Sequence, residues 1–191
     1  DKTGFALVGS TASSDFPIPA GGYDPTYNGS GDAFVLEVAN AAYPALVAGT
    51  FLGGAGVDRA ESVHWYRDDS QIVIAGSTTS TNLPTTPGAF DESSNGGEDG
   101  MVVALTPDLF LSYGSYVGGS ANDGLLGCGE EVLEGTCVVV GGSSSADFPT
   151  SPGAFQEDFG GGPNDGVIVR LPLPDPAAGV APPWRELATA I

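Results

Sequence analysis

Hydrophobic and polar residues alternate in several short runs of this chain. In DAFVLEVA (32–39), DGMVVALT (99–106) and DGVIVRLP (165–172), every second residue is large and apolar, and the positions between them admit small or charged side chains. Alternation with a period of two is typical of β-strands. Helical periodicity is absent, except that PPWRELATAI (182–191) fits either a short helix or a last strand. The pattern therefore predicts an all-β chain.

The strand-like runs belong to a repeat. Three similar segments, STASSDFPIPAGGYD (10–24), STTSTNLPTTPGAFD (77–91) and SSSADFPTSPGAFQ (143–156), carry prolines that are 67 and 65 residues apart. Two further segments, FLGGAGVD (51–58) and YVGGSAND (116–123), are separated by 65 residues. Self-similarity at a fixed period marks a chain built from one supersecondary unit used repeatedly.

The second repeat is complete enough to assign its strands. ESVHWYR (61–67) and QIVIAGS (71–77) flank a turn-forming Asp-Asp-Ser cluster and predict a hairpin. After a long connection rich in Ser, Thr and Pro, DGMVVALT (99–106) and LFLSYGSYVGG (109–119) predict a third and a fourth strand. Four short antiparallel strands in each unit predict a β-propeller-type repeat, in which every unit is one blade.

The chain then holds about three blades, which we place at residues 1–54, 55–119 and 120–172, with a Pro-rich tail at 173–191. The first blade opens at GFALVGST (4–11), which corresponds to the second strand of a blade, so its innermost strand is missing. Propellers have about 4–8 blades, and three do not comfortably close a ring. We expect a partial propeller with exposed apolar faces at both ends. Such an arc would either pair with a second copy into a ring or join a larger assembly.

These motifs resemble the bacterial β-propeller repeat called the SBBP repeat. FLGGAGVD, IVIAGSTTSTNLPTTPGAF and SADFPTSPGAFQ followed by NDGVIVRL match the order of that family's segments, over about residues 4–172. The first copy departs from the pattern in FPIPAGGYD and the third in GEEVLEGT, and 173–191 matches nothing. The resemblance implies a β-propeller in a secreted or cell-surface bacterial protein. It implies no particular activity.

Composition and charge narrow the range of partners. The 24 acidic residues outnumber the 5 basic ones, which gives a formal net charge of −19. Such a surface repels nucleic acid and anionic membranes. No apolar run approaches the roughly 20 residues that cross a bilayer, and no signal peptide is present. We therefore expect a protein partner or self-association, without nucleic acid or membrane insertion.

Catalytic chemistry is not indicated. The single histidine, His64, lies on an alternating strand and is interpreted as structural. The carboxylate pairs Asp68/Asp69 and Glu130/Glu131 fall in predicted hairpin turns, where solvation explains them better than acid–base work. The spacings of zinc ligands, of a phosphate-binding loop and of a nucleophile elbow are all missing. We expect no enzyme activity.

Five aspartates stand beside glycines at equivalent positions of the repeats, namely Asp32, Asp58, Asp99, Asp123 and Asp165. Aspartate accepts local backbone hydrogen bonds in turns, which favours a structural role. Carboxylates in an acidic chain also suit Ca²⁺, a hard cation that takes six to eight oxygen ligands. The sequence thus allows two roles for these aspartates, a structural one and the binding of Ca²⁺, which is the one cofactor that we consider.

The two cysteines, Cys128 and Cys137, are equidistant from a hairpin centre between Val132 and Leu133. Directly opposed strand residues are close enough for a disulfide, so we predict a Cys128–Cys137 bridge, with two buried thiols as the alternative.

Three aromatic residues, Trp65, Tyr66 and Trp184, are candidate stacking platforms for a glycan. The function that fits the sequence best is nonetheless a non-enzymatic, extracellular structural or interaction module. The alternative is a propeller lectin or a calcium-dependent adhesin.

Overall fold

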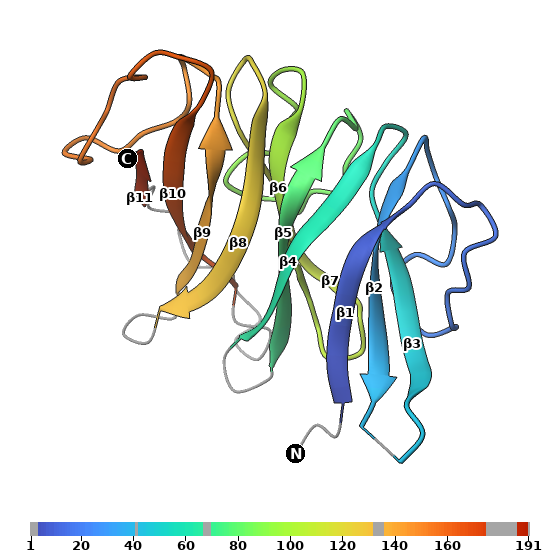
Figure 1. Cartoon of the computed structure of the whole chain (residues 1–191). Helices are drawn as coiled ribbons and strands as arrows, with labels where there is room; N and C mark the ends of the chain where they lie inside the picture. The colour runs from blue at the N-terminus through green and yellow to red at the C-terminus, as the bar shows by residue number, and fades with distance from the viewer. Residues whose placement is uncertain (1–3, 41, 67–69, 132–135, 175–186, 191) are drawn as a thin grey trace.

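A computed structural model describes residues 4–40, 42–66, 70–131, 136–174 and 187–190 of the chain. These residues form three antiparallel sheets that lie side by side (Figure 1). The described residues contain no helix, and so none with the length and hydropathy needed to span a membrane. The predicted all-β class is confirmed.

Within each sheet the strands follow one another in chain order. The first sheet contains β1 (Gly4–Thr11), β2 (Asp32–Ala39) and β3 (Ala45–Leu52). The second contains β4 (Asp58–Tyr66), β5 (Gln71–Thr78), β6 (Asp99–Leu105) and β7 (Leu111–Val117). The third contains β8 (Asp123–Glu131), β9 (Thr136–Ser143), β10 (Asp165–Pro172) and β11 (Leu187–Ala190). None of the three sheets closes on itself in the described part of the chain.

The first sheet is one strand shorter than the other two. By sequence, β1 is the counterpart of β5 and β9, so the first sheet lacks a counterpart of β4 and β8 among the described residues. We call the place of β4 and β8 the inner-strand position. At the other end of the chain, residues 187–190 pair with β10, which decides between the helix and the strand expected there in favour of the strand.

The middle sheet packs on both of its neighbours. Strand β4 contacts β1 and β2, and β8 contacts β4, β5 and β6. One core cluster therefore lies between the first and second sheets and another between the second and third. On β5, Ile72 and Ile74 face the first sheet, whereas Val73 and Ala75 face the third. Burial of both faces explains why QIVIAGST reads as a nearly continuous apolar run rather than an alternation.

Hydroxyl groups attach the long loops to the sheets. Tyr116 on β7 is buried, and its hydroxyl accepts the N–H of Leu83 (2.8 Å) and donates to the carbonyl of Ser80 (2.8 Å). Burial raises the pKa of Tyr116, so the hydroxyl stays protonated and keeps its role as a donor. In the first sheet the loop is held differently, because Phe16 stacks on Phe34 with the ring centroids 4.5 Å apart.

The predicted Cys128–Cys137 disulfide is not present, and neither cysteine is part of a disulfide. The register of the β8–β9 hairpin places Cys128 opposite Val139 and Cys137 opposite Glu130. The two cysteines are therefore diagonal neighbours, at a typical Cα separation of about 7–8 Å that a disulfide does not span. A β-bulge between Leu125 and Gly127 shifts the register within this hairpin. The alternative of two thiols is the one that the structure contains, with Cys137 buried and Cys128 partly buried.

Candidate functional site

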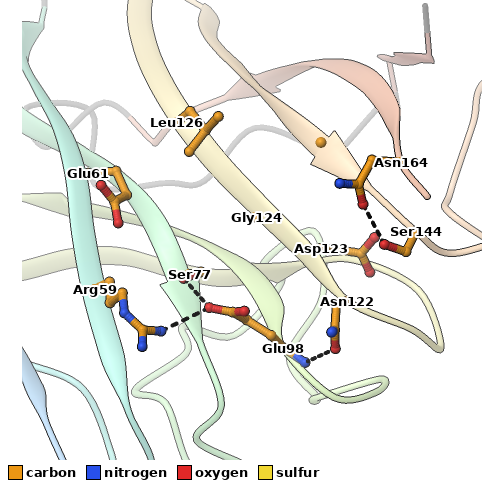
Figure 2. A pocket seen from close by; sticks show the side chains of 11 residues that line it. Arg59, Glu61, Ser77, Glu98, Asn122, Asp123, Gly124, Leu126, Ser144 and Asn164 are labelled. Carbon is orange, nitrogen blue, oxygen red and sulfur yellow. Dashed lines mark hydrogen bonds and ion pairs between the residues drawn. The ribbon is translucent and has the colours of Figure 1, made fainter.

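A polar pocket lies between the second and third sheets, where β4 and β8 begin. Its volume is about 520 Å³, and we call it the seam pocket (Figure 2). The polar side chains that line it are those of Arg59, Glu61, Ser77, Glu98, Asn122, Asp123, Ser144 and Asn164. The two sheets thus flank an open polar pocket at one end of their shared apolar core.

Hydrogen bonds within the seam pocket centre on Glu98. Its carboxylate accepts from Arg59 Nη1 (3.1 Å) and from the hydroxyl of Ser77 (2.6 Å), while its N–H donates to Asn122 Oδ1 (3.2 Å). Both partners of the Arg59–Glu98 ion pair are partly exposed, and such pairs contribute at most about 1 kcal/mol. These groups suit the binding of a polar molecule. The pocket lining includes neither histidine nor cysteine, so it offers no nucleophile with an adjacent imidazole base.

A second polar arrangement, more regular than the pocket, anchors the start of each inner strand. Asp58, the first residue of β4, accepts from the N–H of Gly54 (2.9 Å), from the hydroxyl of Ser80 (2.9 Å) and from the hydroxyl of Thr78. The aspartate is buried, and both of its oxygens are satisfied. The residues Thr78 and Ser80, at the end of β5 and just beyond it, therefore hold β4 in place.

The third sheet repeats this arrangement. Asp123, the first residue of β8, accepts from the N–H of Gly119 (2.7 Å) and from the hydroxyl of Ser145 (2.8 Å). In both sheets the same serine also accepts a backbone N–H from the glycine-rich loop, as Ser145 does from Ala121 (2.8 Å). The inner strands β4 and β8 are thus attached through equivalent glycine and serine contacts, although Asp123 Oδ1 is buried without a hydrogen-bond partner, whereas Asp58 Oδ1 accepts from Thr78.

The loop that precedes each inner strand is held by one further side chain. Asn82 Oδ1 accepts the N–H of Ala55 (2.8 Å), and Asp147 Oδ1 accepts the N–H of Ser120 (2.8 Å). Ser120 donates two hydrogen bonds to Asp147, one from its N–H and one from its hydroxyl, and both lower the pKa of Asp147. The Ser/Thr-rich composition of these segments predicts only a loop, and this anchoring role is an addition from the structure. The available signal was the shared pattern of a Ser/Thr, a Ser two residues later and an Asn/Asp two residues after that.

The other three predicted aspartates serve the long loops. Asp32 Oδ2 accepts the N–H of Asn28 (2.7 Å), Asp99 Oδ2 accepts from Asn95 (3.1 Å), and Asp165 accepts from Gly160. One oxygen each of Asp32 and Asp99 is buried without a hydrogen-bond partner. Burial raises the pKa of both carboxyls, and the neighbouring carboxylates of Asp58 and Asp123, respectively, raise it further.

The structure brings the predicted calcium ligands together in two pairs. Asp32 interacts electrostatically with Asp58, and Asp99 with Asp123 across Gly118. Within the described residues, no three His, Cys, Asp or Glu side chains come close enough to hold a metal ion. Calcium binding therefore stays a prediction, while the local turn role of these aspartates is visible in their hydrogen bonds.

Trp65 and Tyr66, the described aromatic candidates for glycan stacking, do not form an exposed aromatic surface. Tyr66 is fully buried in the core between the second and third sheets, and Trp65 packs partly buried on the other core cluster. His64 is also partly buried, on β4 opposite Val73. Trp184 lies outside the described residues.

Of the two carboxylate pairs predicted in hairpin turns, Asp68 and Asp69 lie outside the described residues. Glu130 and Glu131 belong to strand β8 and not to the turn, because β8 extends to Glu131.

No protein-family model matches the sequence, and no curated protein matches it. The likeness to the SBBP repeat therefore rests on the motifs themselves.

Proposed function

We propose that this chain is a non-enzymatic structural and interaction module, an arc of three propeller-type blades that joins further blades through its end sheets. The observation that carries the proposal is the exposure of apolar residues on the outer face of the first sheet. Phe5 and Leu7 on β1 are 50% and 48% exposed. Their counterparts in the second sheet, Ile72 and Ile74, are fully buried against a neighbouring sheet.

The third sheet supports the same reading from the other end of the arc. Val140 on β9 is 41% exposed, although its counterpart Ala75 on β5 is fully buried. Ile168 pairs with Val140 on the same outer face. The outer face of the third sheet thus corresponds to the face that the second sheet presents to the third. One copy can therefore stack its third sheet on the first sheet of another, as a head-to-tail contact.

This assembly fits a secreted or surface-attached protein. A net charge of −19 keeps such a molecule soluble and opposes non-specific association, so that contact is confined to the apolar end faces. The polar seam pocket favours a second function, the binding of a glycan or another polar ligand as in a lectin.

Light scattering during size exclusion, at several protein concentrations, tests the assembly. We expect the native mass of the wild-type chain to rise with concentration above that of one copy. A Leu7→Lys substitution should hold the mass at one copy, whereas Phe110→Lys, on a similarly exposed residue of the connection between β6 and β7, should leave the assembly unchanged. A mass of one copy for the wild type at every concentration contradicts self-assembly through the end faces.

A further inference from the structure

The end of β1 carries the same hydroxyl groups that hold the inner strands in the other two sheets. Gly9-Ser10-Thr11 on β1 repeats Gly76-Ser77-Thr78 on β5. Two residues beyond this threonine each segment has a serine, Ser13 in the first sheet and Ser80 in the second. Side chains that bind an aspartate in the second sheet therefore have counterparts in the first, which has no inner strand among the described residues.

The local geometry of these counterparts is already formed. The N–H of Ser13 donates to Thr11 Oγ1 (3.1 Å), as the N–H of Ser80 does to Thr78 Oγ1 (2.9 Å). The third sheet has the same contact, from Ser145 to Ser143 Oγ (3.0 Å). The turn thus adopts one conformation whether or not an inner strand is attached. We call Thr11, Ser13 and Asp15 the strand seat.

The strand seat is open in the described part of the chain, where no carboxylate pairs with Thr11 or Ser13. Ser13 is exposed, whereas its counterparts Ser80 and Ser145 are almost completely buried. Asp15, at the position of Asn82, is exposed as well. The groups that would receive an inner strand are therefore accessible to solvent.

Strand β1 next to the seat is an edge strand. In the described residues β1 pairs with β2 only, so its other edge has unpaired backbone groups. A cavity of about 200 Å³ lies beside its end, lined in part by Ser10, Thr11, Gly31 and Arg59. An unpaired edge next to a preformed polar seat is suited to the addition of a strand.

We propose that the first sheet accepts an inner strand donated by a partner chain built from the same repeat. The donated strand carries the pattern Gly-Gly-x-x-x-Asp followed by strand-forming residues, as β4 and β8 do with their preceding loops. Its aspartate lies opposite Thr11, in the register that Asp58 has with Thr78, and accepts the hydroxyls of Thr11 and Ser13. Ser13 Oγ and Asp15 accept the N–H groups of its loop, as Ser80 and Asn82 do.

This inference rests on the proposed function, because it names how a further blade would be joined to the arc. The partner is defined by chemistry already present in the chain, namely the contacts of the β4 strand with β5. A strand lacking the aspartate would leave the two hydroxyls unpaired, so the aspartate sets the specificity and the register.

Binding of a synthetic peptide with the sequence of residues 51–66 tests the proposal, measured by fluorescence anisotropy against the intact chain. We expect saturable binding that weakens by about tenfold or more when the aspartate of the peptide is replaced (Asp58→Ala), because charge-assisted hydrogen bonds are lost. In the chain, a Thr11→Val, Ser13→Ala double substitution should weaken binding similarly. Ser14→Ala, an exposed neighbour outside the seat, is the matched control and should not.

Absence of binding at millimolar peptide, or equal binding of the peptide without its aspartate, would overturn the strand seat. The titration uses a protein concentration at which light scattering gives the mass of one copy, so that the seat is not occupied by a second copy. Failure of end-face assembly is seen separately, as a native mass unaffected by Leu7→Lys. The two proposals can therefore fail independently.

Discussion

The first and second sheets are built from closely similar sequences but differ in what surrounds them. The second sheet has its inner strand and a neighbour on each face, and strands β5 and β6 are buried along their whole length. In the described part of the chain, the first sheet has no inner strand and is covered on one face, so that β1 exposes Phe5 and Leu7. The same residue positions thus belong to a core in one repeat and to a surface in the next.

The comparison shows which features a repeat makes by itself and which need a neighbour. The Ser/Thr turn forms in all three repeats with the same hydrogen bond, so local sequence determines it. Burial of the equivalent side chains instead depends on the adjacent sheet. In repeat proteins, the free energy of unfolding is approximately the sum of the stability of each repeat and that of its interfaces with neighbouring repeats.

The largest expected difference between the two sheets is in the free energy of unfolding that is lost when equivalent apolar residues are truncated. Ile74→Ala removes a fully buried side chain of the middle sheet, and we expect the free energy of unfolding to fall by about 2–5 kcal/mol. Leu7→Ala, at the equivalent half-exposed position, should cost less than about 1 kcal/mol in the single chain. Urea unfolding of both variants measures the difference. Equal losses would mean that the first sheet is as well covered as the second.

A second pair of variants compares two buried aspartates. Asp58 accepts hydrogen bonds through both oxygens, so Asp58→Asn places an amide N–H₂ against a donor and should cost about 1–3 kcal/mol. Asp99 has one buried oxygen without a partner. Asp99→Asn keeps an acceptor for Asn95 and removes a buried charge, so we expect an unchanged or higher melting temperature at pH 7. A larger loss for Asp99→Asn than for Asp58→Asn would contradict this assignment.

The pH dependence of Asp99→Asn sharpens that comparison. The pKa of Asp99 is raised in the folded state, so its contribution to stability is fully present below the unfolded pKa and is lost as the pH rises through the folded pKa. Any advantage of Asp99→Asn over the wild type should therefore shrink as the pH falls from 7 towards 4. Thermal unfolding across this range checks the sign, and an advantage that grows on acidification would refute it.

The smallest expected effects concern the serines of the strand seat and its counterpart. Ser80→Ala removes a donor to Asp58 and an acceptor for the N–H of Gly56, which we expect to cost about 1 kcal/mol. Ser13→Ala removes an exposed hydroxyl and should change the stability of the free chain by less than about 0.5 kcal/mol. Denaturant midpoints of the two variants give the comparison. A destabilisation by Ser13→Ala as large as that by Ser80→Ala would show that the seat is already filled.

The sequence predicts the strands well because the repeat supplies three versions of each one. The alternation in residues 99–106 and the hairpin of 61–67 with 71–77 appear in the structure as β6 and as the β4–β5 pair. Alignment of the repeats carries this information without any knowledge of contacts.

The alternation of hydrophobic and polar residues does not predict the register of the β4–β5 and β8–β9 hairpins. Bulges lie at equivalent places in β4, between Ala60 and Ser62, and in β8, between Leu125 and Gly127. Each adds one residue to one strand, which no alternation pattern reveals. The expected pairing of Cys128 with Cys137 failed for another reason: the pairs Cys128–Val139 and Glu130–Cys137 centre the hairpin one residue later than the sequence analysis placed it. The aspartate-binding role of Ser80 and Ser145 was missed because it joins segments more than 20 residues apart in sequence.

The central claim is that the first sheet is open at its inner edge and accepts a strand there. Amide hydrogen exchange of β1 and β5, read by mass spectrometry with and without the peptide of residues 51–66, tests it most directly. We expect β1 to exchange much faster than β5 in the free single chain and to become protected when the peptide binds, while β5 stays unchanged. Protection of β1 equal to that of β5 without peptide, or no change in β1 on its addition, would contradict the claim.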